Sequence, residues 1–246
     1  MTKSANSFSF KVKDVFTCLN LVAALYSVIL SIQGEIIRAS LFILLVWLLD
    51  GLDGFIAKWT KSANQFGANF DNLVDLFGFS VAPSFVIYAS YIGYSQILAL
   101  SLCFFIITVG TIRLAKFQTK PLDVPGYWIG FPRPASGFFI IFLLNSNLFL
   151  DHGLFLVGGL LIILVGLLSL TYLPYKSNKA KFTKFQTFLI FLAPTSSMLL
   201  FPYGYMWDLA LFWITVYVLQ PWIGVNKKDR EEIKARVREW KGIDKA

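Results

Sequence analysis

Four aspartates lie within otherwise apolar stretches of the sequence, where ionised side chains are costly. Asp50 and Asp53 are three residues apart, and Asp71 and Asp75 are four residues apart. On an α-helix, either spacing places both side chains on one face. An ionisable residue in a membrane span costs about 2.5 to 3.5 kcal/mol even on insertion scales, so four of them indicate a compensating partner. Two such pairs facing each other would form a cup of four carboxylates.

Divalent cations that prefer oxygen ligands are the partner that this cup predicts. Carboxylates favour Mg²⁺, Mn²⁺ or Ca²⁺ over zinc, and two divalent ions would balance four negative charges. The sequence has a single histidine, His152, and its two cysteines, Cys18 and Cys103, lie in apolar runs. These counts exclude a two-histidine zinc site and a thiolate cluster. We therefore predict two ions, Mg²⁺ or Mn²⁺, with Ca²⁺ as an inhibitor or a substitute.

Small residues accompany the acids, and two interpretations of them stay open. Glycine inside a helix costs roughly 0.5 to 1 kcal/mol relative to alanine, so Gly54 and Gly67 indicate that something approaches the backbone. Gly54 and Ala57, three residues apart, could support a flat nucleobase or a phosphate, or they could allow helices to pack closely. Lys58 could contact a phosphate, or it could extend to the membrane interface.

The composition predicts that these residues belong to an all-α integral membrane protein, a polytopic helix bundle. Of its 246 residues, 57% are hydrophobic and 15% are charged, and the mean hydropathy is +0.66. A membrane-spanning helix needs about 20 apolar residues. Eight candidate spans follow from the apolar runs: residues 15–32, 36–59, 70–94, 96–117, 135–150, 154–173, 185–201 and 206–222.

The positive charges predict the orientation of these spans. All of the 22 lysines and arginines except Arg38 fall in the ends and joints that eight spans would place on one side, and such residues are retained in the cytoplasm. Both termini, and the acidic cup, are therefore expected at the cytoplasmic face. The net charge of +8 indicates attraction to anionic membrane lipids, and no nucleic-acid partner is expected. We also expect no cleavable secretory signal.

Three regions follow from this topology. Residues 1–14 would be a cytoplasmic or interfacial segment, residues 15–225 the transmembrane domain, and residues 226–246 a basic cytoplasmic tail. In the tail, Ile233, Val237 and Trp240 recur at helical spacing. The tail could therefore lie in the membrane interface as an amphipathic helix, or it could be a solvated charged segment.

The aspartates and glycines belong to one longer pattern: DGLDGFIAK (residues 50–58), eight residues, then GANFDNLVD (residues 67–75). This pattern resembles the signature of the CDP-alcohol phosphotransferase family, D-x2-D-G-x2-A-R-x8-G-x3-D-x3-D. Lys58 in place of arginine is the one departure, which keeps the positive charge but loses the planar bidentate fork. Residues 14–20, 77–88, 111–118, 130–137 and 170–179 are similar to segments of the family's phosphatidylserine synthase branch.

The resemblance implies an enzyme of a prokaryotic cell membrane whose active site faces the cytoplasm. It would transfer a phosphatidyl group from CDP-diacylglycerol, or from an archaeal CDP-lipid, to the hydroxyl of L-serine and release CMP. A homodimer is also implied. The metal ligands would be Asp50, Asp53, Asp71 and Asp75, with Asp75 as the alternative catalytic base, and the CDP-lipid site would include Gly54, Ala57, Lys58 and Gly67.

Two arginines are candidates for binding the acceptor. Arg113 and Arg133 could each pair with the serine carboxylate or a lipid phosphate, or they could merely anchor the topology. With Lys116 and Lys120 they could also form a basic cluster for a phosphorylated acceptor, which keeps glycerol 3-phosphate and inositol phosphate open beside choline. A cation transporter is the alternative of another class, although its acids would be expected near the bilayer midplane.

Overall fold

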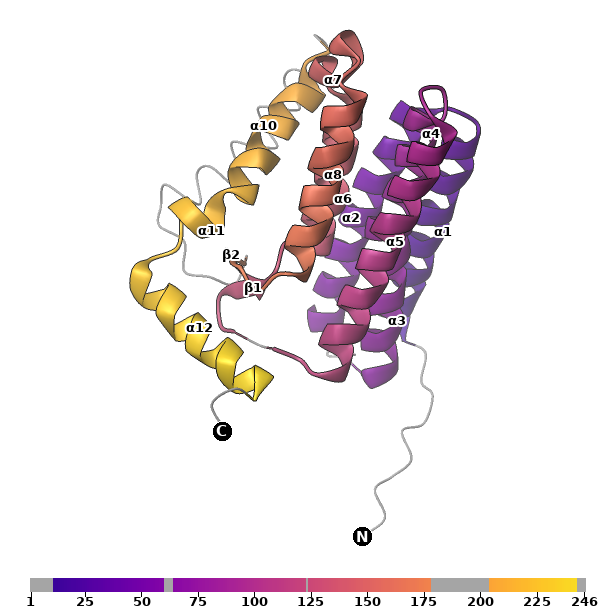
Figure 1. Cartoon of the computed structure of the whole chain (residues 1–246). Coiled ribbons are helices and arrows are strands. Elements are labelled where there is room, and N and C mark those ends of the chain that lie inside the picture. The colour runs from indigo at the N-terminus through magenta and orange to yellow at the C-terminus, as the bar shows by residue number, and fades with distance from the viewer. Residues whose placement is uncertain (1–10, 60–63, 123, 178–203, 243–246) are drawn as a thin grey trace. The chain divides into compact units, whose positions relative to one another are not determined.

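The computed structural model describes residues 11–59, 64–122, 124–177 and 204–242, which are mostly helical (Figure 1). Four helical segments are long and apolar enough to cross a membrane: Val12–Ile32, Ile36–Ile56, Gln65–Tyr91 and Gln96–Thr119. The predicted membrane character is thereby confirmed. The chain divides into two compact units, residues 1–103 and 104–246, and the boundary falls within one helix, α5 (Gln96–Thr119).

The first unit begins with α1 (Val12–Ile32) and α2 (Ile36–Trp59), close to the first two predicted spans. A third helical segment consists of α3 (Gln65–Leu76), a π-helical turn η1 (Phe77–Val81) and α4 (Ala82–Tyr91), which run on without a break. It begins at Gln65, whereas the prediction began it at residue 70. The reason is a side-chain cap, since Asn64 Oδ1 accepts a hydrogen bond of 2.7 Å from the amide of Gly67.

Small side chains bring the helices of this unit together. Where α1 contacts α2, Ala24, Ser27 and Ala39 are buried, and Ser27 Oγ donates a 2.8 Å hydrogen bond to the Ala39 carbonyl. A Cβ on Gly78 of η1 would lie only 2.5 Å from Val46 Cγ1 of α2. Close packing through small residues is the usual way in which membrane helices associate.

The second unit combines the remainder of α5 with short helices and a two-stranded sheet. Its elements are β1 (Tyr127–Ile129), α6 (Arg133–Asn145), α7 (Asn147–His152), α8 (Phe155–Leu170), β2 (Pro174–Lys176), α10 (Met206–Val218), α11 (Gln220–Ile223) and α12 (Lys227–Lys241). The strands pair antiparallel, with Trp128 opposite Tyr175. The sequence did not predict them, because three residues are too few to establish a strand period.

Some predicted spans differ from the helices that form. The span predicted at 135–150 is interrupted at Ser146, whose extended backbone ends α6 and whose Oγ caps α7 by accepting from the amide of Phe149. His152 is the last residue of α7 and precedes Gly153, whose φ is +57°. The apolar helices α6, α8 and α10 have 13, 16 and 13 residues. The span predicted at 185–201 lies outside the described residues.

The C-terminal tail forms the amphipathic helix that one interpretation expects, but its apolar face is covered by the chain itself. Ile233 and Val237 are buried together with Val124 and Ile129 of the segment around β1. The tail is therefore part of the fold of the second unit.

Candidate active site

Three of the four predicted aspartates meet in the first unit. One carboxylate oxygen from each of Asp50, Asp71 and Asp75 lies within 4.8 Å of the others, and all three residues are half-buried. Asp50 comes from α2, and the other two lie one turn apart on α3. The side chain of Asp53 lies outside the described part of the chain. We refer to Asp50, Asp71 and Asp75 as the carboxylate group.

The contact between Gly78 and Val46 explains how two helices deliver these side chains to one place. Val46 precedes Asp50 by four residues and Gly78 follows Asp75 by three, so each lies on the same helix face as its aspartate. The near contact of Val46 with the backbone of Gly78 therefore holds α2 against the third helical segment beside the carboxylates. Gly78 lies in η1, and single π-helical turns occur often at functional sites.

The donor set fits divalent cations. Three carboxylates this close repel one another unless a cation lies between them, and Oδ1 of both Asp71 and Asp75 is buried. Oxygen ligands from Asp are those that Mg²⁺, Mn²⁺ and Ca²⁺ bind. The arrangement could thus hold such an ion between α2 and α3.

The two glycines of the signature have different surroundings, which bears on whether each serves helix packing or the approach of a ligand. Among the described residues, no atom lies within 4 Å of where a Cβ on Gly54 would be. Helix packing therefore does not account for this glycine in the described structure, and its backbone is open to approach. The side chains of Ala57 and Lys58 lie outside the described part.

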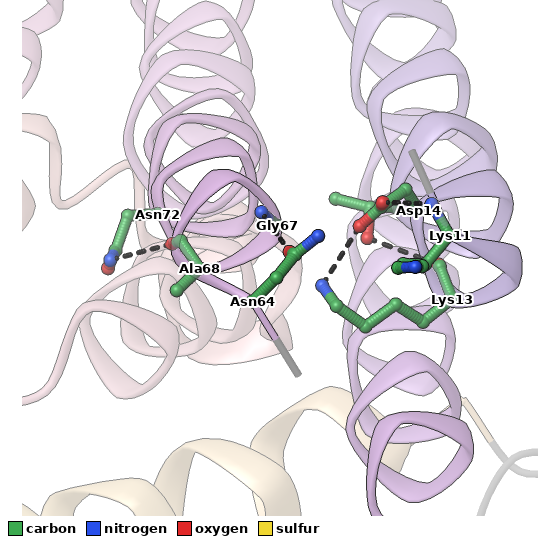
Figure 2. Close-up of polar contacts among 8 residues, drawn as sticks. Lys11, Lys13, Asp14, Asn64, Gly67, Ala68 and Asn72 are labelled. Atoms are coloured by element: carbon green, nitrogen blue, oxygen red, sulfur yellow. Dashed lines mark hydrogen bonds and ion pairs between the residues drawn. The ribbon is translucent and has the colours of Figure 1, made fainter. Parts of the chain in front are cut away.

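Gly67 is different, because it packs against α1. A Cβ there would lie 2.7 Å from both Asn64 Oδ1 and Asp14 Oδ1 and would collide with Lys13 Nζ. Figure 2 shows Lys13 and Asp14 of α1 facing Asn64 and Gly67 at the start of α3. Close helix packing is therefore sufficient to explain Gly67.

The charged pair at this contact was missed by sequence reasoning. Lys13 Nζ lies 2.9 Å from Asp14 Oδ1, and both side chains are buried. The amide of Lys11 also donates to Asp14 Oδ2 at 2.6 Å. From the sequence, Lys13 is predicted only to be one of the positive charges that set the topology, because adjacent residues at a helix start give no spacing signal for a buried pair.

The two arginines belong to the second unit, where Arg113 is buried. Its guanidinium donates to the carbonyls of Ser169, at the end of α8, and of Ile129, in β1, the latter at 3.2 Å. It also lies 5.1 Å from the centroid of the Phe117 ring. Arg113 thus ties β1 to the end of α8.

Gly130 completes this connection. Its φ is +72°, and a Cβ would lie 2.5 Å from the Ser169 carbonyl and 2.7 Å from Arg113 Nη1. Its amide donates to the carbonyl of Leu173 at 2.8 Å. Arg133 follows as the first residue of α6 and is half-buried. A cation at the N-terminus of a helix, where backbone amides point outward, suits an anionic ligand.

Comparison with known proteins identifies the chain's family. The family model for CDP-alcohol phosphatidyltransferase matches residues 10–220, which confirms the resemblance drawn from the signature. The chain is 31% identical over 163 residues to a CDP-diacylglycerol–serine O-phosphatidyltransferase of Methanocaldococcus jannaschii, covering 65% of this chain and 71% of that protein.

Two further relatives match shorter stretches. A protein of the same name from Helicobacter pylori is 31% identical, over 52% of this chain and 54% of its own. The archaetidylserine synthase of Methanothermobacter thermautotrophicus is 36% identical, over 43% of this chain and 46% of its own. The chain thus spans about half the length of these two. Since the family model covers most of the sequence, including all four aspartates, the chain belongs to the CDP-alcohol phosphatidyltransferase family.

Proposed function

We propose that this enzyme transfers a phosphatidyl group from CDP-diacylglycerol, or from the corresponding archaeal CDP-lipid, to the hydroxyl of L-serine. The observation that carries the proposal is the carboxylate group, whose oxygens lie within 4.8 Å of one another in the segment that matches the family. The names of the relatives support serine as the acceptor.

The chemistry exchanges one phosphorus–oxygen bond for another. The serine hydroxyl oxygen forms a bond to the phosphorus that carries the lipid, and the bond from that phosphorus to the oxygen shared with CMP breaks. Bound Mg²⁺ or Mn²⁺ would neutralise the diphosphate and stabilise the negative charge on the leaving CMP. Asp50, Asp53 and Asp71 would hold the ions.

Asp75 has two open roles in this step. It would either complete the ligand set or accept the proton that serine loses. A carboxylate bound to a metal is a weak base, so the second role requires Asp75 to be partly free of the ions. Of the four residues expected at the CDP-lipid site, Gly54, Ala57 and Lys58 would contact the donor, and Gly54, with open space at its backbone, is best suited to a close approach. Gly67 would contribute through its packing against α1.

For the acceptor, we assign the serine carboxylate to Arg133 and a positioning role to Arg113. Two donors of Arg113 bind backbone carbonyls, which suits a positioning role. Arg133 is half-buried at the start of α6, where the backbone amides of the helix add to its attraction for an anion. A guanidinium can bind a carboxylate through two parallel hydrogen bonds.

The remaining basic residues favour serine over a phosphorylated acceptor. Lys116 Nζ donates to the Leu170 carbonyl at 3.1 Å and lies 3.8 Å from the centroid of the Tyr172 ring. Lys120 Nζ donates to the Trp240 carbonyl. Like Arg113, these two lysines donate to backbone carbonyls of the fold. They therefore do not form the dense basic cluster that a phosphate group would require.

We further propose the topology that the charges predict. The chain would cross a prokaryotic cell membrane eight times, with residues 15–225 as the transmembrane domain, both termini in the cytoplasm and the carboxylate group at the cytoplasmic face. This location suits a nucleotide lipid whose tails lie in the bilayer and whose cytidine faces the cytoplasm. The enzyme would act as a homodimer.

Acceptor competition in detergent tests the proposed reaction. The purified protein is incubated with CDP-diacylglycerol and with serine, glycerol 3-phosphate, inositol phosphate or choline, each with and without Mn²⁺ or Mg²⁺. We expect CMP release that requires both serine and a divalent cation. Release supported by another alcohol alone would contradict serine as acceptor, and cation flux through vesicles without CMP release would support the transporter alternative.

A further inference from the structure

Helix α12 contacts β1 near its own start and Lys120, the residue after α5, near its own end. Near its start, the Tyr127 hydroxyl donates a 2.7 Å hydrogen bond to Asp229 Oδ2. At its end, Trp240 Nε1 donates to the Lys120 carbonyl at 3.2 Å, and Lys120 Nζ donates in return to the Trp240 carbonyl. The Lys120 ammonium also lies 4.9 Å from the centroid of the Trp240 ring.

Between these ends, α12 buries its apolar face together with Val124 and with Ile129 of β1. Ile233 is 3% exposed and Val237 is 8% exposed, and they form one cluster with Val124 and Ile129. Burying aliphatic side chains is favourable in proportion to the apolar area removed from water. The helix is thus held by packing as well as by polar contacts.

Ile129 connects this cluster to the candidate acceptor residues. Its side chain packs against α12, while its carbonyl accepts the hydrogen bond from Arg113. The next residues are fixed to the end of α8, since the amide of Phe131 donates to the Leu168 carbonyl at 3.1 Å. Arg133 follows four residues after Ile129. A continuous set of contacts therefore runs from α12 to the start of α6.

We propose that α12 is a positioning element for the acceptor: it holds Lys120 and residues 124–133 so that Arg133 is aimed at the acceptor's carboxylate. This inference rests on the proposed function, because it takes Arg133 as the acceptor-binding residue. The helix supplies no catalytic residue of its own. Its contribution is pre-organisation, which lowers the conformational cost of binding.

The hydrogen bond at the start of α12 persists at neutral pH. Burial, together with the hydrogen bond to Asp229, raises the pKa of the Tyr127 phenol above its ordinary value near 10. The phenol therefore remains protonated and continues to donate through the pH range of an enzyme assay.

Kinetics of three variants test the positioning role. Trp240→Ala removes the indole's hydrogen bond to Lys120 and its ring contacts with the Lys120 ammonium and with Tyr172, while the backbone carbonyl of residue 240 stays. Tyr127→Phe removes one hydrogen bond while keeping the ring. Lys234→Ala is the matched control, because Lys234 forms an exposed ion pair with Glu231 on the same helix. We expect Trp240→Ala to raise KM for serine by about fivefold or more, the lower end of coupling between distant sites. KM for CDP-diacylglycerol should stay unchanged, Tyr127→Phe should have a smaller effect of the same kind, and Lys234→Ala should have none.

A readout without catalysis separates this inference from the proposed reaction. Hydrogen exchange of the amides in residues 124–133 should become faster in Trp240→Ala and stay unchanged in Lys234→Ala, whichever acceptor the enzyme uses. Unchanged exchange in Trp240→Ala, or equal rises of KM for both substrates, would overturn the positioning role. If hydrogen exchange changes as expected but the unmodified protein does not use serine, the proposed reaction is wrong. The attachment of α12 to Lys120 and β1 is then still supported. Trp240→Phe, which keeps an aromatic ring, covers the case in which Trp240→Ala does not fold.

Discussion

At the scale of single residues, the two signature glycines perform different tasks although their spacing to the aspartates looks alike. Gly67 lets the buried Lys13–Asp14 pair lie against the start of α3 (Figure 2). Gly54 has open space where a side chain would be. Sequence alone left both interpretations open at both positions, because spacing within one helix does not reveal which neighbouring helix approaches.

This difference predicts opposite outcomes for two alanine substitutions. Gly67→Ala should destabilise the protein by about 1 to 3 kcal/mol, the usual cost of overpacking, because its methyl group would meet Asn64, Asp14 and Lys13. Gly54→Ala should leave stability unchanged or raise it by about 0.5 to 1 kcal/mol through helix propensity. It should also raise KM for CDP-diacylglycerol if that backbone contacts the donor.

Thermal unfolding in detergent and donor kinetics measure the two effects. Equal stability of both variants would contradict the packing role of Gly67. An unchanged KM in Gly54→Ala would remove that glycine from the donor site.

At the scale of elements, the turn between β1 and α6 determines where Arg133 lies. It depends on Gly130, which combines a positive φ of +72° with close approach of the Ser169 and Thr171 carbonyls at 2.5 and 2.8 Å from a Cβ. A larger residue would therefore be strained and would also collide with backbone.

We expect Gly130→Ala to cost more stability than Gly204→Ala. Gly204 has a similar φ of +76°, but no described atom lies within 4 Å of its Cβ position, so its substitution carries strain alone. Strain of this kind costs about 1 to 3 kcal/mol, and Gly130→Ala adds the collision. The free energies of unfolding of the two variants, compared with that of the unmodified protein, measure the additional cost at Gly130. Equal losses of stability would show that the two carbonyls move aside without cost.

The elements also show how far sequence reasoning reached. The first two helices follow the predicted apolar runs almost residue for residue, because twenty apolar residues constrain a helix strongly. Arg113 contacts carbonyls 16 and 56 residues away, and β1 pairs with β2 by placing Trp128 opposite Tyr175. No periodic pattern in the sequence predicts contacts between segments so far apart. For the same reason the covered face of α12 was visible as amphipathic, while its partner around Ile129 was not.

At the scale of the whole molecule, the distribution of lysine and arginine predicts the orientation in the membrane. Gln33, after α1, would lie on the outer side, and Lys234, on α12, would lie in the cytoplasm. Both residues are exposed, so each can carry a reporter cysteine after Cys18 and Cys103 are replaced.

A membrane-impermeant maleimide applied to intact cells should therefore label Gln33→Cys and leave Lys234→Cys unlabelled until the cells are opened. Labelling of Lys234→Cys in intact cells would place the C-terminal helix outside. That result would contradict the cytoplasmic location of both termini.

The central claim is that the carboxylate group binds the divalent cations on which phosphatidyl transfer depends. Its most direct test is a titration with Mn²⁺ followed by electron paramagnetic resonance, using detergent-purified protein, the Asp71→Asn variant and, as a control, Asp151→Asn on the exposed end of α7. We expect the unmodified protein and Asp151→Asn to bind Mn²⁺ alike, and Asp71→Asn to lose that binding. The rate of CMP release should also fall by at least about 100-fold in Asp71→Asn, because loss of an outer-shell partner of a metal ligand already costs up to about that factor. Mn²⁺ binding and turnover that survive unchanged in Asp71→Asn would contradict the claim.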